Sequence, residues 1–373
     1  MQQMHDAVIV GGDPAGASCA LWLARLGLAP LLVEASGRLG GLSVDNPFAD
    51  DWIAVLPGMT GQQVAANIDT SVRAAGVPLR LDTRVTAVRP CKGGIEATLV
   101  DANGDVSQTR GRTLVIASGV RAKGFPEHPP GASWPGVLIG PGSPIVAQDY
   151  SGLSVAVLGG GDNAFENYVY VRNRGARAVH LYARSVRAQQ QWVLRAGKEG
   201  VRIGPYQVDP AARSVDGQRY DLILVFYGWE PQAAFADSLQ LARDERGYIR
   251  TDFATAETSV PDIYAIGEVA HRMHPCVVTS MADGVVAAKA IQRRWERAGS
   301  SFAFPGPCWP ALGPRRVSSP APTCLFFSAT AGSPAPPRGI HRAARCWTGA
   351  RRPAAAIARP ARSRRSARHG WRR

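Results

Sequence analysis

The chain has 373 residues and a formal net charge of +14, from 43 basic and 29 acidic side chains. The excess lies in residues 301–373, which hold 14 arginines, no lysine and no acidic residue, so residues 1–300 are neutral. The length allows two domains, and a neutral main part excludes a general nucleic-acid binder. The six cysteines form no C-x-x-C pair, which argues against a disulfide framework and against a zinc cluster.

The N-terminal part bears on the compartment of the protein. Residues 1–6 lack the basic region of a signal peptide, and Arg25 interrupts the apolar stretch over residues 17–33. We therefore expect a cytoplasmic protein without a membrane span. The sequence also predicts no metal site, because its cysteines lack the spacing of metal ligands.

The chain opens with a strand–helix–strand unit that contains a glycine-rich turn. The hydrophobic pattern predicts a strand over residues 7–10, a helix over 14–26 and a buried strand over 29–33. Pro14 fits the first turn of the helix, where its missing N–H costs nothing. A unit of about 30 residues with a glycine turn after its first strand is typical of dinucleotide-binding domains.

A second unit of the same kind follows a Pro/Gly-rich connection over residues 124–144, which is expected to form a linker and loops. Its glycine turn again follows an apolar run and precedes a helical pattern. Beyond the first unit, helices are expected over residues 62–75, 163–174 and 279–297. Strands are expected over residues 84–88, 94–100, 112–116, 178–182, 222–226 and 263–266, and a further strand is expected to begin at residue 153.

Residues 298–373 differ in character from the rest of the chain. From residue 301 on they contain 11 prolines, repeated Ala-Arg and Ser-Arg pairs, and no apolar periodicity. Such a segment cannot bury enough apolar surface to offset its ordering entropy, so we predict a disordered basic tail. Two other interpretations stay open: an off-frame translation of a GC-rich gene, or a tether for nucleic acid or another acidic surface.

The first glycine turn fits a dinucleotide at its outer positions. In such a turn, small residues let the backbone approach a pyrophosphate, which then sits at the helix N-terminus. Gly11 and Gly16 are small, whereas Asp13 brings a negative charge to the middle position, where its alternative role is to cap the helix. Glu34 follows at the end of the second strand, where an acid can accept hydrogen bonds from ribose hydroxyls, or else be an ordinary exposed residue.

The second turn has small residues at all three positions, namely Gly159, Gly161 and Ala164. No acid follows at the ribose position. Arg184 and Arg187 stand there instead, and the planar fork of arginine suits the 2′-phosphate of NADP. The turn therefore favours NADPH over NADH, although a solvated loop arginine is the simpler alternative.

The order of these motifs resembles the low-molecular-weight thioredoxin reductases and their cysteine-free relatives. The resemblance covers residues 5–297 and rests on the two glycine turns, Ala117-Ser118-Gly119, Gly228-x-x-Pro231, Ala265-Ile266-Gly267-Glu268-Val269 and Thr279-Ser280. It implies that the run containing Glu268 holds the ribityl chain of FAD, and that the helix beginning at Thr279 and Ser280 points its N-terminus at the flavin, where it would stabilise negative charge.

Two departures from that family bear on the electron acceptor. Thioredoxin reductases carry a redox C-x-x-C shortly before the second glycine turn, where this chain has Gly142-Ser143-Pro144-Ile145. Dithiol–disulfide exchange needs an attacking and a resolving thiol, so ordinary thioredoxin reduction is not expected. An Arg-Gln pair beside the flavin in the family corresponds to Pro275-Cys276, so Cys276 is either a flavin neighbour or a buried small hydrophobe.

The predicted fold is α/β, with two Rossmann-like dinucleotide-binding domains. An FAD domain comprises residues 1–118 and 246–297, and an inserted NAD(P)H domain comprises 119–245. The residues predicted to hold FAD are Gly11, Asp13, Pro14, Ala15, Gly16, Glu34, Gly41, Ala117, Gly119, Gly267, Glu268, Thr279 and Ser280, and those predicted to hold NADPH are Gly159, Gly161, Asp162, Ala164, Arg184 and Arg187.

The function implied by the resemblance is an FAD-dependent NAD(P)H oxidoreductase that passes hydride from NAD(P)H to FAD and on to another acceptor. We assign no acid–base catalyst, because the cofactor carries the redox chemistry. Ferredoxin or flavodoxin is the favoured acceptor, followed by a quinone, and the family implies a homodimer. The alternative from another class is a non-catalytic flavin or nucleotide sensor, or a degenerate family member.

Overall fold

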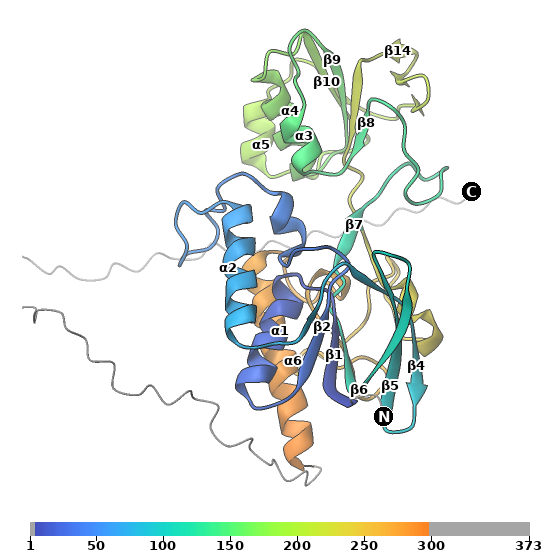
Figure 1. Cartoon of the computed structure of the whole chain (residues 1–373). Helices are drawn as coiled ribbons and strands as arrows, with labels where there is room; N and C mark the ends of the chain where they lie inside the picture. Colours follow the sequence, from blue (N-terminus) through green and yellow to red (C-terminus); the bar gives the residue numbers. More distant parts are fainter. Residues whose placement is uncertain (1–3, 298–373) are drawn as a thin grey trace, which may run out of the picture. The chain divides into compact units, whose positions relative to one another are not determined.

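The computed structural model describes residues 4–297, and the predicted tail lies outside them (Figure 1). The helices are α1 (Pro14–Arg25), α2 (Gly61–Ala74), α3 (Ser143–Ala147), α4 (Asp162–Arg172), α5 (Gln190–Ala196) and α6 (Val277–Arg297), with 3-10 turns η1 (Gly41–Asp45), η2 (Ala234–Leu239) and η3 (Gly267–Val269). The strands of the first sheet are β1 (Met4–Val10), β2 (Pro30–Val33), β3 (Leu79–Arg80), β4 (Thr83–Cys91), β5 (Gly94–Asp101), β6 (Val106–Ile116) and β17 (Ile263–Ala265).

The first sheet is parallel on one side and antiparallel on the other. Its strand order is β3-β2-β1-β6-β5-β4, and β17 pairs with the C-terminal part of β6. Strands β1, β2, β3, β6 and β17 run parallel, whereas β4, β5 and β6 form an antiparallel meander. The carboxyl ends of β1, β6 and β17 therefore meet at one edge, which is where ligands bind in sheets of this kind.

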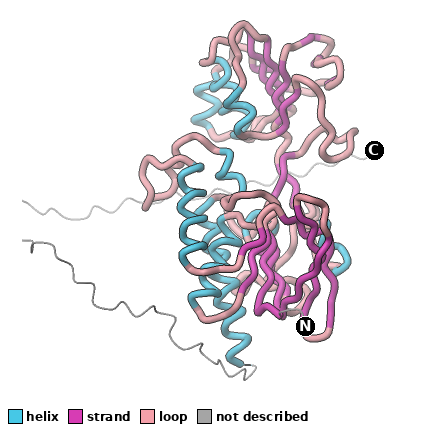
Figure 2. Tube along the Cα trace, in the orientation of Figure 1, coloured by secondary structure: helices cyan, strands magenta, loops and turns pink. Residues whose placement is uncertain are grey.

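Alternation along β1 explains how this sheet is covered. Ala7 and Ile9 face α1 and α6, while Val8 and Val10 face the apolar residues of β4, β5 and η2. All four side chains are buried, so the two faces of β1 pack into two different hydrophobic cores. In Figure 2 the long helices lie on one side of these strands and a short helical turn lies on the other. The glycine turn after β1 is thus held by packing on both faces.

A second parallel sheet has the strand order β11-β10-β9-β15-β8. Its strands are β8 (Val137–Ile139), β9 (Ser154–Leu158), β10 (Ala178–Ala183), β11 (Val201–Ile203) and β15 (Leu222–Val225). Val155 and Val157 face a core that includes Phe165 of α4, and Ala156 and Leu158 face aromatic residues on the other side. The two parallel sheets confirm the predicted α/β class with two Rossmann-like units.

Two smaller sheets complete the described part of the chain. Strands β7 (Val120–Ala122) and β16 (Trp229–Pro231) pair antiparallel. The chain passes through β7 before the strands of the second sheet and through β16 after them, so the two connections form a two-stranded ribbon. Strands β12 (Val208–Asp209), β13 (Ser214–Val215) and β14 (Gln218–Arg219) form an antiparallel meander. Among residues 4–297, no helix is long and apolar enough to cross a membrane.

The predicted connection over residues 124–144 is only partly a loop. It contains β8, which pairs with β15 at the edge of the second sheet, and the first residues of α3. The expectation of loops throughout was therefore wrong at Val137–Ile139. A three-residue strand flanked by Gly136 and Gly140 is too short for a periodic pattern, and its place is fixed by pairing with a strand far along the chain.

Candidate functional site

The first glycine turn lies where β1 meets the end of β6. Gly11 has a φ of 108°, and a Cβ added there would lie 2.1 Å from the Ala117 carbonyl oxygen. A Cβ on Gly16 would lie 1.9 Å from the Gly11 carbonyl oxygen. Both positions therefore require glycine, because the backbone of the turn, α1 and the loop after β6 are in direct contact.

A cavity of about 470 Å³ opens at this turn. Residues from the end of β1, the end of β2, the loop after β6, η3 and the start of α6 line it together, which is what the carboxyl-end rule for parallel sheets predicts. The predicted FAD residues that line it are Gly11, Asp13, Pro14, Glu34, Gly41, Ala117, Gly119, Glu268 and Ser280.

The other four predicted FAD residues lie behind or beside the cavity. Ala15 and Gly16 are buried inside α1. Gly267 and Thr279 line a smaller adjoining pocket that Glu268 and Ser280 share. The structure therefore brings nine of the predicted residues into the cavity wall and places the remaining four in the backbone that supports it.

Asp13 is the N-cap of α1, as its alternative role required. Its Oδ1 accepts a hydrogen bond from the Gly16 N–H at 2.8 Å, and the Ala15 N–H also donates to the carboxylate. Burial raises the pKa of Asp13 to about 8, and the nearby negative charges of Glu268 and Glu34 add to this, while the two backbone hydrogen bonds oppose it.

Glu34 reaches back to the same turn from the end of β2. Its Oε2 accepts from the Gly12 N–H at 2.6 Å, and its Oε1 accepts from the Ser36 N–H at 2.8 Å. The carboxylate is thereby fixed at the rim of the cavity, with its charge directed to the turn. This placement agrees with the ribose role that the sequence predicted for it, which no contact in the structure tests.

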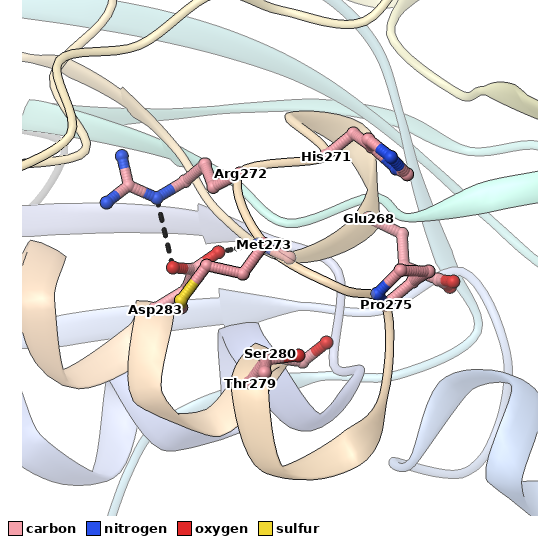
Figure 3. A pocket seen from close by; sticks show the side chains of 9 residues that line it. Glu268, His271, Arg272, Met273, Pro275, Thr279, Ser280 and Asp283 are labelled. Atoms are coloured by element: carbon pink, nitrogen blue, oxygen red, sulfur yellow. Dashed lines mark hydrogen bonds and ion pairs between the residues drawn. The ribbon is translucent and has the colours of Figure 1, made fainter. Parts of the chain in front are cut away.

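The η3 turn carries Glu268 between the cavity and the smaller pocket (Figure 3). Burial raises the pKa of Glu268. The turn is anchored from below by Asp283 on α6, whose Oδ2 accepts from the Gly267 N–H at 3.1 Å. Figure 3 shows Arg272 reaching Asp283, with 3.0 Å between Nε and Oδ1, and both side chains are only 3% exposed.

Arg272 joins this turn to a second loop. Its guanidinium donates to the Thr251 hydroxyl at 2.9 Å and to the Asp252 and Phe253 carbonyls at 2.6 Å each. Each of the three guanidinium nitrogens thus donates a hydrogen bond, and such a buried ion pair is costly to break on one side because the remaining charge stays buried. The pair therefore sets the position of η3, and with it the position of Glu268.

The start of α6 closes the cavity on another side. Ser280 is buried at the cavity wall, and the Thr279 hydroxyl donates to the His274 carbonyl at 2.6 Å. Cys276 also lines the cavity, with its Sγ 3.3 Å from the Thr279 Oγ1. Of its two interpretations, this location favours a neighbour of whatever fills the cavity over a fully buried hydrophobe.

The second glycine turn repeats the steric pattern of the first. Gly159 has a φ of 141°, and a Cβ there would lie 2.4 Å from the Phe226 carbonyl oxygen. Ala164 is fully buried in α4. Gly161 is the N-cap of α4 without a side-chain cap, and open space surrounds the position where its Cβ would be. The N-terminus of α4 therefore keeps its backbone donors available for an anion.

The loop after β10 folds over this turn. The Arg187 N–H donates to the Gly160 carbonyl at 2.7 Å, and both carboxylate oxygens of Asp162 accept from Gln189, at 2.7 and 2.9 Å. Arg184 and Arg187 have exposed side chains, and the Arg184 guanidinium lies 6.0 Å from the centre of the Tyr206 ring. Asp162 thus holds the loop that carries the two arginines.

Three features of these sites were not predicted from the sequence. Arg38 lines the cavity beside Glu34, and its place shortly after the ribose acid was the available signal. A Cβ on Gly160 would lie 1.9 Å from the Ser185 carbonyl oxygen, which explains why the middle residue of the three consecutive glycines is also glycine. The Arg272–Asp283 pair had no sequence signal, because it depends on how a loop packs against α6.

The two turns fit dinucleotides to different degrees. The second has small residues where backbone crowds the chain, an uncapped helix N-terminus and two nearby arginines, all of which suit a phosphorylated nucleotide. The first has the same close approach and a cavity of sufficient size for part of a cofactor. One residue of the first turn does not fit a dinucleotide: the Asp13 carboxylate lies where a pyrophosphate would bind.

Comparisons with known proteins identify what the chain is similar to. The model of the pyridine nucleotide-disulphide oxidoreductase family matches residues 5–288. A thioredoxin reductase of Chlamydia trachomatis is 29% identical over 320 residues, which cover 77% of this chain and 97% of that protein. A ferredoxin–NADP reductase of Granulibacter bethesdensis is 28% identical over 297 residues, which cover 71% and 81%.

Solved structures agree with the fold. The thioredoxin reductase of T. acidophilum matches with a TM-score of 0.64 and 20% identity, over 79% of this chain and 99% of that one. A bacillithiol disulfide reductase of Bacillus cereus matches with a TM-score of 0.66 and 19% identity, over 78% and 100%. These findings confirm the predicted resemblance, the predicted fold and the predicted oxidoreductase class.

Proposed function

Because the chain belongs to the pyridine nucleotide-disulphide oxidoreductase family, we propose that it binds FAD at the first glycine turn and NADPH at the second. It is a flavoprotein oxidoreductase that uses NAD(P)H and is thioredoxin-reductase-like in class. The observation that carries the FAD assignment is the cavity itself, where the turn, Glu34, η3 and the start of α6 converge. The domain boundaries at residues 118/119 and 245/246 belong to this proposal.

The residues of the first site are proposed to bind FAD and to orient it. A bound FAD supplies the redox chemistry, namely two-electron exchange between NAD(P)H and a second substrate. Glu34 accepts hydrogen bonds from ribose hydroxyls, and Glu268 holds the ribityl chain. The first turn of α6 begins at Val277, two residues before the predicted start, and includes Thr279 and Ser280; it would stabilise negative charge on the flavin by about 0.3–2 kcal/mol. No side chain is assigned as an acid or a base.

The residues of the second site select the nucleotide. Gly159, Gly161 and the N-terminus of α4 receive the pyrophosphate, and Asp162 positions the loop through Gln189. Arg184 and Arg187 bind the 2′-phosphate of NADPH, which NADH lacks. NADH is therefore the weaker substrate, and its use is an outcome that kinetics would reveal.

The acceptor is proposed to receive electrons from the flavin without a protein disulfide. Cys19, Cys91 and Cys276 are free in the part of the chain that the structure describes, and residues 142–145 at the start of α3 contain no thiol. A dithiol mechanism needs two thiols that can form a disulfide with each other. A small redox protein such as ferredoxin or flavodoxin is favoured, and similarity to a ferredoxin–NADP reductase supports this; a quinone comes next.

A panel of acceptors tests this proposal. Oxidation of NADPH would be followed with ferredoxin, flavodoxin, a quinone and oxidised thioredoxin, for the wild-type chain and for Cys276→Ser as the control variant. We expect turnover with at least one of the first three and none with thioredoxin, and Cys276→Ser should keep turnover with the same acceptors. Thioredoxin reduction that Cys276→Ser abolishes would contradict the cysteine-free mechanism. A homodimer in the cytoplasm is the expected state of the enzyme.

One observation favours a second function. The cavity wall carries four carboxylates, which oppose an anionic cofactor, so a sensor that binds nucleotides without turnover is the alternative. A sensor would bind NADPH at the second turn but consume none with any acceptor. Equilibrium binding of NADPH combined with an inactive panel is the result that would select it.

A further inference from the structure

The charge of the first cavity is unlike that expected for a site that receives a pyrophosphate. The other titratable residues that line it with Asp13 are Glu34 and Arg38 after β2, Asp45 in η1, Glu268 in η3, and Cys276 before α6. Among these described residues, Arg38 is the one cation and it is exposed. A phosphate group that enters meets an excess of negative charge.

Asp13 occupies the chemical position of the phosphate. Its carboxylate takes the N–H groups of Gly16 and Ala15, which are the donors that an anion at the N-terminus of α1 would use. An ionised Asp13 and a phosphate therefore compete for the same backbone dipoles. Two negative groups at one helix N-terminus also repel each other.

Three glycines lie beside the Asp13 side chain. A Cβ built on Gly41 would lie 2.8 Å from the Asp13 Cβ, and Cβ atoms built on Gly119 and Gly267 would lie 3.6 and 3.5 Å from the Asp13 Oδ2. The backbone of these segments therefore comes close to Asp13 at positions that have no side chain.

A proton resolves the conflict without any movement. A neutral carboxylic acid keeps one oxygen as the acceptor for the Gly16 N–H and gains an O–H donor on the other. We propose that FAD binds to this chain together with a proton on Asp13, whose O–H then donates a hydrogen bond to a phosphate oxygen. The proton comes from solvent, and no covalent bond is made or broken. This inference rests on the proposed FAD site.

The raised pKa of Asp13 sets the range in which the effect is seen. Below about pH 8 the group is already protonated and FAD affinity is constant, whereas above it binding must take up a proton. The dissociation constant then rises by up to about tenfold for each further pH unit.

FAD titrations of the apoprotein across about pH 6–10 test the proposal through fluorescence quenching. Asp13→Asn keeps an acceptor for the Gly16 N–H and has an N–H donor at every pH. We therefore expect that the FAD dissociation constant of this variant does not rise above pH 8 as that of the wild type does. Asp149→Asn is the matched control, because Asp149 also accepts a backbone N–H, from Ser151 at 2.9 Å, but is exposed. It should keep the wild-type profile.

Calorimetry gives a second readout that needs no variant. Above pH 8, wild-type FAD binding measured in two buffers of different ionisation enthalpy should show proton uptake approaching one per FAD. Wild-type binding without a pH step or without proton uptake, or an unchanged step in Asp13→Asn, overturns this inference alone. Failure of the wild type and of Asp13→Asn to bind FAD at any pH overturns both the inference and the proposed FAD site.

Discussion

The two glycine turns solve the same steric problem with opposite electrostatics. In both, the first glycine has a positive φ and lies against a backbone carbonyl, of Ala117 in one case and of Phe226 in the other. The first turn has its helix donors taken by Asp13, whereas Gly161 leaves those of α4 without a side-chain cap. A glycine pattern therefore reports how closely backbone can approach a ligand, and the charge around it must be examined separately.

The largest effect is expected from Gly11→Ala in the first turn. The methyl group would overlap the Ala117 carbonyl at 2.1 Å in a backbone conformation that disfavours side chains, so the free energy of unfolding should fall on the order of 4 kcal/mol. Denaturant unfolding measures this. Gly161→Ala in the second turn is the control and should change stability by less than about 0.5 kcal/mol, since its Cβ has open space. Equal losses would contradict the steric account.

Breaking the support of η3 comes next. Arg272→Met leaves Asp283 buried and unpaired, so we expect a loss of about 3 kcal/mol in the free energy of unfolding, together with weaker FAD binding. The control is Arg73→Met, which removes an exposed pair with Asp69 and should cost about 0.5 kcal/mol or less. If both variants unfold at the same denaturant concentration as the wild type, the buried pair does not hold the turn.

Above pH 8, the first turn is expected to bind FAD better without its acid. Asp13 of the free protein is ionised there, and Asp13→Gly removes this charge from the pyrophosphate position and frees the Gly16 N–H, so the dissociation constant for FAD above pH 8 should fall by about tenfold or less, limited by the lost helix cap. Equilibrium titration of the apoprotein measures it. Weaker binding by Asp13→Gly above pH 8 would mean that the ionised acid makes a favourable contact with the cofactor.

In the second turn, Arg184→Ala should affect one nucleotide more than the other. A lost charged hydrogen bond to the 2′-phosphate raises the KM for NADPH by about tenfold, while the KM for NADH changes little. Steady-state kinetics with both nucleotides measure the ratio. A parallel rise for NADPH and NADH would remove the argument for the 2′-phosphate.

Local patterns predicted the elements that carry the turns, because β1 and β9 end in apolar runs and a glycine turn separates each of them from the helix that follows, α1 or α4. The same patterns could not predict β8, which exists through pairing with β15. They also could not show that Asp13, Glu34 and Glu268 share one cavity, since that depends on three strand ends meeting. The steric demands of a glycine turn can be predicted from the local sequence, whereas the charge of a site depends on which residues the tertiary structure brings together.

The central claim is that both turns act in one redox cycle, and anaerobic reduction tests it most directly. Protein loaded with FAD below pH 8 would be mixed with NADPH while the visible absorbance of the flavin is followed. We predict bleaching within the mixing time and slower bleaching with NADH. Flavin that remains bound and oxidised under an excess of both nucleotides would contradict the account.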